Sequence, residues 1–311
     1  MTQLPRWASA GAESLLEEQA GERARVATGG LHPNCVGLLQ APVQPARGLV
    51  LALHGWSAGP YQYSQLAQQL SDSGLAIWAP RLPGHGARRA GREDPSDLPT
   101  ADNWRDYGSF ASQTLARART WATAQGLPLY LSGFSMGGAL ALDMLGQAPE
   151  ACQRLLWLAP LLRPYGLWPR LQVRMLRLAA AHGRQALFDT RPTGWGTEAT
   201  LPPERAGHWR FPLGALYAAI EYAHQVALRV QRLPVPCQLI LTAADRTCDP
   251  AAAMRLWRTA PRPRGCAIFP RAQGVPHAML GVQDNPDPVS RTRVEAIALA
   301  FLGQGDVTDQ A

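Results

Sequence analysis

Short runs of consecutive apolar residues recur along this chain, and segments with helical periodicity separate most of them. A run of four to eight apolar residues is typical of a strand that is buried on both faces. Strands that alternate with helices favour a mostly parallel sheet with helices on both faces, so the pattern predicts the α/β class. The predicted strands cover residues 49–53, 75–79, 127–131, 154–158, 237–242 and 266–269, and the predicted helices include residues 102–124, 139–145, 250–259 and 288–302.

The N-terminal region has a different pattern. Residues 1–22 are polar and rich in alanine, which favours a short helix or a loose extension. Residues 23–28 and 35–40 are predicted to form two strands of an opening hairpin around Gly29 and Gly30.

The pattern changes again after residue 160. Residues 161–232 have helical periodicity and many aromatic residues, with no convincing strand. We therefore expect one α/β core made of residues 1–160 and 233–311, and a helical cap or lid inserted at residues 161–232.

Residues 133–137 read Gly-Phe-Ser-Met-Gly and lie between a predicted strand and a predicted helix. This arrangement matches G-x-S-x-G, in which a serine occupies a sharp strand-to-helix turn and glycines two positions away avoid steric clashes. Such a turn exposes the hydroxyl at the positive end of a helix. The pattern makes Ser135 a candidate nucleophile, although five residues alone also fit an ordinary helix-opening turn.

A serine nucleophile requires a base and a carboxylate that orients the base. Asp245 follows the strand predicted at 237–242, and His277 follows the strand predicted at 266–269. All three candidates therefore lie at carboxyl ends of strands, where α/β sheets place their active sites. Asp249 is a competing carboxylate, but it precedes Pro250 and a predicted helix, so an N-cap role explains it.

The tetrahedral intermediate of acyl transfer needs two donors aimed at its oxyanion. The backbone N–H of Met136 follows the nucleophile, and Trp56 lies in the loop after the strand predicted at 49–53, so both are candidate oxyanion-hole donors. The Trp56 indole either lines an acyl pocket or packs against its own loop.

The formal charge of +7 does not indicate a nucleic-acid partner. The chain contains no lysine, and its arginines are dispersed rather than clustered. The five cysteines are an odd number without C-x-x-C spacing, which argues against a disulfide framework or a zinc site. The N-terminal residues lack an apolar segment of signal-peptide length, so we expect a cytoplasmic protein.

These motifs together resemble the monoacylglycerol lipase, lysophospholipase and carboxylesterase branch of the α/β-hydrolases. The resemblance covers about residues 48–160 and 236–302 and depends on His54-Gly55-Trp56, Pro83-Gly84-His85-Gly86, the GFSMGG sequence at 133–138, Asp245 with Cys248-Asp249, and His277. It implies an α/β-hydrolase fold, a triad of Ser135, Asp245 and His277, and an oxyanion hole at Trp56 and Met136. It also implies ester hydrolysis that needs no metal or organic cofactor.

The apolar residues of the cap indicate the substrate class. The candidate substrate-binding residues are Trp56, Leu161, Tyr165 and Trp168. Because an apolar cap favours an acyl chain, we expect monoacylglycerols, lysophospholipids or similar medium-chain esters as substrates. Within residues 168–181, arginines alternate with apolar residues at helical spacing. This spacing fits a cap helix with a solvated arginine face, or transient contact with a membrane surface.

Other activities remain open on the same fold. A proline-iminopeptidase-like aminopeptidase would need cap carboxylates for a substrate amine, and Asp189, Glu198, Glu204 and Glu221 are available. An acyltransferase would exclude water from the acyl-enzyme. A non-catalytic ligand receptor could also use a hydrolase scaffold. The oligomeric state has no signal in the sequence.

Overall fold

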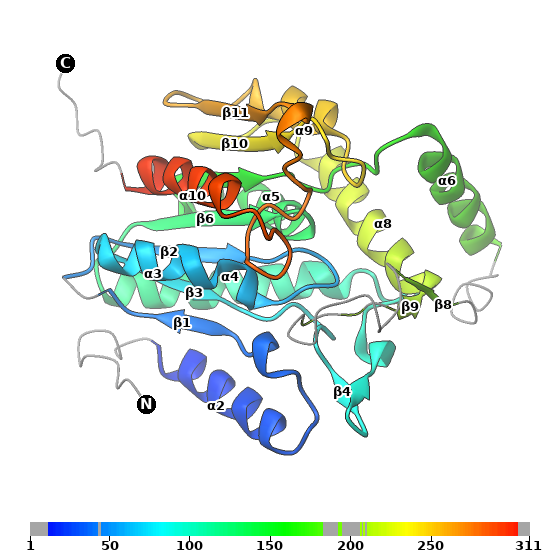
Figure 1. Ribbon diagram of the computed structural model, residues 1–311, viewed down its shortest axis with the longest axis horizontal. Helices are drawn as coiled ribbons and strands as arrows, with labels where there is room; N and C mark the ends of the chain where they lie inside the picture. Colours follow the sequence, from blue (N-terminus) through cyan, green and yellow to red (C-terminus); the bar gives the residue numbers. More distant parts are fainter. Residues whose placement is uncertain are drawn as a thin grey trace.

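A seven-stranded sheet forms the centre of the computed structural model, which describes residues 12–42, 45–182, 192–194, 206, 208 and 210–303 (Figure 1). The strand order is β1-β3-β2-β6-β7-β10-β11; β1 pairs antiparallel with β3, and the other pairs are parallel. The α/β class predicted from the sequence is therefore confirmed. The strands are β1 (Leu38–Gln40), β2 (Gly48–Leu53), β3 (Leu75–Ala79), β6 (Leu129–Phe134), β7 (Arg154–Leu158), β10 (Cys237–Thr242) and β11 (Gly265–Phe269).

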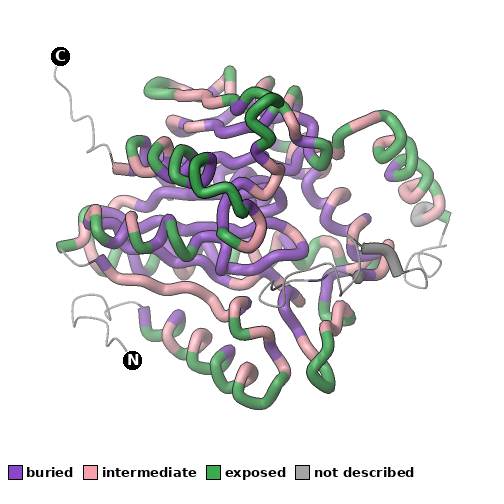
Figure 2. The backbone as a smooth tube through the Cα atoms, viewed as in Figure 1, coloured by how far each residue is buried: buried purple, intermediate pink, exposed green. Residues whose placement is uncertain are grey.

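Helices cover both faces of the sheet. Strand side chains alternate between the faces, so Leu49 and Leu51 of β2 enter one apolar core while Val50 and Ala52 enter the other. The first core includes α4 (Asp106–Ala124), α5 (Met136–Gln147) and α9 (Pro250–Trp257), and the second includes α3 (Ser64–Asp72) and α10 (Pro288–Leu302). Figure 2 shows buried strands between helices whose outer faces are exposed.

The predicted opening hairpin was wrong. Residues 13–27 form the helix α2 (Glu13–Ala27), so the segment predicted as a first hairpin strand is helical, and β1 pairs with β3 instead. This segment is rich in Glu, Ala, Gln and Arg, which favour a helix. Tertiary contacts also hold the helix, because Glu22 accepts hydrogen bonds from Arg81 (2.7 Å) and from the Gly37 N–H (2.6 Å).

The segment between β7 and β10 contains α6 (Leu167–Ala181), β8 (Pro192–Gly194), β9 (Arg210–Pro212) and α8 (Leu213–Arg229). Strands β8 and β9 pair antiparallel, a feature that the sequence pattern did not predict. Helix α8 packs against α5, where Tyr222 and Arg229 donate hydrogen bonds to the Asp143 carboxylate at 2.7 and 2.8 Å. Helix α6 lies at the periphery of the molecule (Figure 1).

The remaining elements are short. Strands β4 (Arg88–Arg89) and β5 (Arg92–Glu93) form a small two-stranded sheet. Single 3-10 turns lie at Pro33–Cys35, Pro60–Tyr63, Pro95–Asp97, Pro149–Ala151 and Arg271–Gln273. Every helix within the described part of the chain is too short or too polar to cross a membrane.

Candidate active site

Ser135 stands in the turn between β6 and α5 with φ 52° and ψ −114°, a conformation that a non-glycine residue rarely adopts. Its N–H donates to the Leu158 carbonyl at 3.0 Å, and its carbonyl accepts from the Leu161 N–H at 2.8 Å. The flanking glycines allow the turn to close. A Cβ at Gly133 would lie 2.5 Å from the Gly137 carbonyl oxygen, and a Cβ at Gly137 would lie 1.9 Å from the Leu53 carbonyl oxygen at the end of β2.

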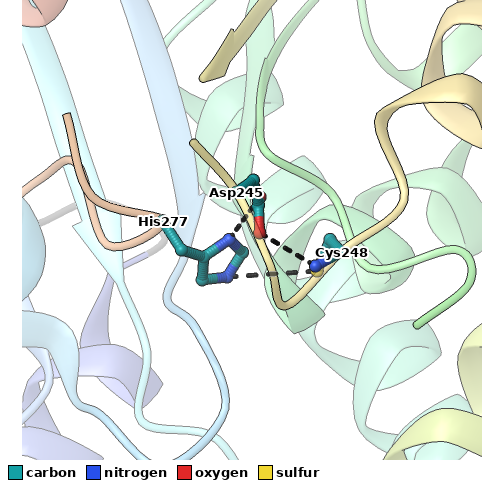
Figure 3. A group of neighbouring side chains, drawn as sticks. All are labelled: Asp245, Cys248 and His277. Atoms are coloured by element: carbon teal, nitrogen blue, oxygen red, sulfur yellow. Dashed lines mark hydrogen bonds and ion pairs between the residues drawn. The ribbon is translucent and has the colours of Figure 1, made fainter. Parts of the chain in front are cut away.

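The structure brings Ser135, His277 and Asp245 into one hydrogen-bonded chain. His277 Nε2 lies 3.0 Å from Ser135 Oγ, and His277 Nδ1 lies 2.7 Å from Asp245 Oδ2. The second Asp245 oxygen accepts the N–H groups of Thr247 at 2.7 Å and Cys248 at 3.0 Å. The carboxylate is therefore fixed from both sides, and Figure 3 shows it beside the imidazole ring.

The hydrogen bond to Asp245 sets the protonation of His277. A carboxylate acceptor places the ring proton on Nδ1 and leaves the Nε2 lone pair directed at Ser135. Burial opposes a positive charge on the ring, but the neighbouring Cys248 sulfur and the Asp245 carboxylate outweigh it and raise the pKa of His277 above that of a free histidine. The arrangement therefore favours proton transfer from the serine hydroxyl.

The two candidate oxyanion donors belong to adjacent segments. Met136 begins α5 directly after Ser135. The strand-to-helix turn at residues 133–137 is here called the elbow. Because Gly137 approaches Leu53 closely, the end of β2 lies against the elbow, and the loop containing Trp56 follows directly from it. Two hydrogen bonds hold this loop: the Gly55 N–H donates to Gln62 at 2.9 Å, and the Ser57 N–H donates to His85 Nε2 at 3.1 Å.

Two buried histidines support the loops beside the site without joining it. His54 Nε2 accepts the Leu82 N–H at 3.0 Å, and its Nδ1 lies 2.8 Å from the Gly55 carbonyl. His85 bonds Ser57 and the Pro83 carbonyl. Because burial is the largest influence, the pKa of His54 falls to about 3 and that of His85 lies well below its ordinary value. Both rings are neutral links that hold the neighbouring loops in place.

Of the candidate substrate-binding residues, Leu161 is buried and its backbone is bonded to the elbow. The Trp56 indole donates to the Tyr107 hydroxyl at 3.1 Å and packs against Phe211. Tyr165 and Trp168 are 45% and 77% exposed, so neither side chain is buried in the site.

The predicted solvated arginine face of α6 is wrong for two arginines. Arg170 pairs with Asp249 at 2.7 Å, and Arg177 pairs with Glu221. The helix is turned so that these arginines face buried carboxylates, because ion pairs compensate the cost of burying Asp249 and Glu221. Its apolar side is exposed instead and carries Leu167, Trp168, Leu171, Met175 and Leu178.

The N-cap role predicted for Asp249 is confirmed. Its carboxylate accepts the Ala251 N–H at 3.0 Å at the start of α9 and also binds Arg163 and Arg170. The sequence reasoning did not assign a role to Cys248, whose sulfur lies 4.0 Å from Ser135 Oγ and 3.9 Å from His277 Nε2. Its position three residues after Asp245, in the same strand-end loop, was the available signal.

The chain has the features that define an α/β-hydrolase. Its sheet is mostly parallel, the elbow serine follows β6, and an aspartate and a histidine lie in the loops after β10 and β11. More specifically, the chain belongs to the family described as serine aminopeptidase, S33, whose model matches residues 44–280. The resemblance to the monoacylglycerol lipase and esterase branch is thereby confirmed at the level of the family and fold.

Curated relatives are similar over part of the chain. A pimeloyl-[acyl-carrier protein] methyl ester esterase of Aromatoleum aromaticum is 32% identical over 108 residues, 34% of each chain. A thermostable monoacylglycerol lipase of a Bacillus species is 26% identical over 103 residues, 33% of this chain and 37% of the relative. The matches thus span about a third of the length of the curated relatives.

Solved structures match over most of the chain. A soluble variant of the monoglyceride lipase from Saccharomyces cerevisiae, in complex with a substrate analogue, has a TM-score of 0.64 and 18% identity, over 86% of this chain and 90% of that one. The monoacylglycerol lipase of Paleococcus ferrophilus has a TM-score of 0.61 and 17% identity, over 86% and 98%. At this identity the likeness establishes the fold.

Proposed function

We propose that this protein is a serine hydrolase that cleaves carboxylic esters through an acyl-serine intermediate. The observation that carries the proposal is the hydrogen-bonded chain from Ser135 Oγ through His277 to Asp245, at distances of 3.0 and 2.7 Å. An alcohol, an imidazole and a carboxylate in this order are the minimal apparatus for acyl transfer to serine. The family membership and the esterase and lipase relatives support the same reaction.

In the proposed mechanism, His277 Nε2 takes the Ser135 proton as Oγ attacks the ester carbonyl carbon. The developing oxyanion accepts hydrogen bonds from the N–H groups of Met136 and Trp56. The imidazolium, stabilised by Asp245, gives its proton to the leaving alcohol, and an acyl-serine remains. His277 then removes a proton from water, whose oxygen attacks the acyl carbon, and returns that proton to Ser135 as the acid leaves.

The proposed substrates are monoacylglycerols, lysophospholipids or similar medium-chain esters. The relatives carry the names of a methyl ester esterase and a monoacylglycerol lipase, which supports an apolar acyl chain on the substrate. We propose that residues 161–232 form a cap over the core and that Leu161 and the Trp56 indole contact the acyl chain. Trp168 would join them only if α6 moves, and Tyr165 only if the segment before α6 moves, because both side chains are exposed.

Aminopeptidase activity is the main alternative, since the family description names it. A substrate amine requires a carboxylate that is free to receive it. Glu221 does not meet this requirement because it is paired with Arg177, and Asp189, Glu198 and Glu204 lie outside the described residues. Glu221 therefore does not support the aminopeptidase alternative, and the acyltransferase and receptor alternatives gain no specific support.

Contact of the proposed cap with a lipid surface is part of this proposal. The exposed apolar side of α6 would face the lipid, because Arg170 and Arg177 are paired with carboxylates of the protein. An apolar helical face of this kind fits the boundary between headgroups and acyl chains.

The direct test is labelling with a fluorophosphonate, combined with a screen of p-nitrophenyl esters of graded chain length beside monoacylglycerol, lysophospholipid and prolyl-p-nitroanilide. We expect rapid labelling of the wild-type protein, none of Ser135→Ala, and turnover of esters but not of the anilide. An added alcohol, with analysis of transesterified product, distinguishes an acyltransferase. A protein that resists labelling and hydrolyses none of these substrates would exclude the proposed function.

A further inference from the structure

The imidazole of His277 faces two side chains that can bind an electrophile. Besides Ser135, the Cys248 sulfur lies 3.9 Å from His277 Nε2, and in Figure 3 a dashed line joins Cys248 directly to the imidazole ring. Metal sites built from His, Cys, Asp or Glu usually bring at least three such side chains close together. Within the described part of the chain, one such group is present: the ligand atoms of Asp245, Cys248 and His277 all lie within 4.8 Å of one another. The Cys248 and Asp245 residues are buried.

The separation of sulfur and nitrogen suits a bound cation. Zinc lies about 2.3 Å from a thiolate sulfur and about 2.0 Å from an imidazole nitrogen, so the two donors around a tetrahedral ion are about 3.6 Å apart. The observed 3.9 Å is close to that value. Ser135 Oγ, 3.0 Å from Nε2 and 4.0 Å from the sulfur, offers a third donor on the same side.

Asp245 completes the arrangement without binding the ion. Its carboxylate already accepts the His277 Nδ1 proton and the N–H groups of Thr247 and Cys248. A histidine that binds a metal through Nε2 usually donates its Nδ1 proton to a carboxylate, which fixes the ring and strengthens the ligand. The hydrogen bond that orients the proposed base therefore also orients a metal ligand.

We propose that Cys248 Sγ and His277 Nε2, with Ser135 Oγ, bind a thiophilic divalent cation of the Zn²⁺ class and that the bound ion inhibits the enzyme. Binding replaces the Cys248 thiol proton, which passes to solvent, and the cation accepts the Nε2 lone pair that the reaction needs. Sulfur and imidazole donors select Zn²⁺ over Mg²⁺ or Ca²⁺, which prefer oxygen. Inhibition rests on the proposed function, whereas binding does not.

The other cysteines provide controls. Burial raises the pKa of the Cys35 and Cys152 thiols to about 12, which disfavours the thiolate that a metal requires. Cys266 is half-buried in β11, where its thiol contacts the Met254 sulfur at 3.6 Å rather than the active site. A Cys266→Ala variant removes a more accessible thiol and leaves the proposed ligands in place.

The binding experiment uses the untagged full-length chain in equilibrium dialysis against Zn²⁺, and Co²⁺ absorption as a report of sulfur coordination. We expect one Zn²⁺ per wild-type chain, and an affinity at least about tenfold weaker in Cys248→Ala and in His277→Ala. We expect the Cys266→Ala variant to match the wild type. A Cys248→Ala variant that retains the wild-type affinity, or a Co²⁺ spectrum without a sulfur charge-transfer band, would overturn the proposed site.

The inhibition experiment measures the Zn²⁺ concentration that halves hydrolysis of p-nitrophenyl butyrate, relative to the metal-free rate of each variant. We expect this concentration to rise at least about tenfold in Cys248→Ala and to remain unchanged in Cys266→Ala. Equal sensitivity of Cys248→Ala and the wild type would refute inhibition through this site. A wild-type protein that hydrolyses no ester but binds Zn²⁺ through Cys248 would refute the proposed function and leave the metal site standing.

Discussion

The rings of Trp56 and Phe211 meet edge to face, with their centroids 4.5 Å apart and their planes at 75°. Phe211 belongs to β9, in the segment between β7 and β10, and is 2% exposed. Trp56 belongs to the loop that we propose as half of the oxyanion hole, and its indole is anchored to Tyr107. This contact joins the proposed cap to the loop that would hold the oxyanion.

We expect Phe211→Ala to lower kcat several-fold for a short ester such as p-nitrophenyl acetate, which does not need an acyl pocket. Aromatic pairs contribute about 0.5–1.5 kcal/mol beyond the area that they bury, so the loss should loosen the Trp56 loop. The Phe211→Leu variant keeps most of the apolar contact and serves as the control. Unchanged kcat in a folded Phe211→Ala protein would mean that the proposed cap does not support the oxyanion loop.

Asp245 and Asp249 lie four residues apart, but their partners differ. We expect Asp245→Asn to lower kcat by about 10³ to 10⁴, because an amide can stabilise the wrong tautomer of His277. Asp249→Asn retains an oxygen that caps α9, so its kcat should fall by less than about tenfold. Steady-state kinetics on p-nitrophenyl butyrate compares the two. Similar losses in both variants would contradict the assignment of Asp245 as the triad acid.

The elbow tolerates no side chain at Gly137. A Cβ there would lie 1.9 Å from the Leu53 carbonyl oxygen, which belongs to the rigid backbone of β2. We expect Gly137→Ala to lower the free energy of unfolding by more than about 2 kcal/mol and to abolish fluorophosphonate labelling. A Cβ at Gly21 in α2 would meet open space, so Gly21→Ala should be neutral or stabilise the fold by up to about 1 kcal/mol. Urea unfolding measures both.

The exposed apolar side of α6 predicts a substrate-dependent effect. Met175 and Leu178 are 70% and 57% exposed, so changing both to glutamine should leave the fold intact. We expect several-fold slower hydrolysis of monoacylglycerol in vesicles and an unchanged rate on a soluble short ester. Leu228→Gln, on α8 and also 57% exposed, is the matched control and should affect neither rate. Equal rates on vesicles for the double variant and the wild type would exclude lipid contact through this face.

The sequence predicted the sheet well because the signal for a buried strand is local. The apolar runs at β3, β7 and β10 have the predicted bounds, and the loops after the strands bring Ser135, Asp245 and His277 together. The hydrophobic pattern was ambiguous at α2, where residues 23–28 alternate like a strand but belong to a segment rich in helix formers.

Other features depend on residues that are distant in the sequence. The side of α6 that faces the protein is decided by Asp249 and Glu221, which pair with Arg170 and Arg177 from 79 and 44 residues away. Likewise, the approach of Cys248 to Ser135 crosses 113 residues. Periodicity identifies an amphipathic helix, but it does not show which side meets an oppositely charged partner.

Acid should destabilise the fold through His54 and His85, which are neutral when buried. The pKa of His54 is lowered from 6.5 to about 3 and that of His85 is also lowered, so the unfolded chain binds protons that the folded chain does not. Their contribution to stability is complete above pH 6.5 and is lost as the pH falls toward the lowered values. At pH 5 the protonation of His54 should cost about 2 kcal/mol of the free energy of unfolding, and His85 should add to this loss in the same direction.

Urea unfolding at pH 7.5 and pH 5 measures this loss. A glutamine at position 85 can accept the Ser57 N–H as His85 Nε2 does, but it does not titrate. We therefore expect His85→Gln to reduce the pH-dependent loss, even if it lowers stability at both pH values. His182 is exposed, and His182→Gln serves as the control for a histidine-to-glutamine change. If His85→Gln and His182→Gln had the same pH dependence, the acid sensitivity would have to arise from other groups.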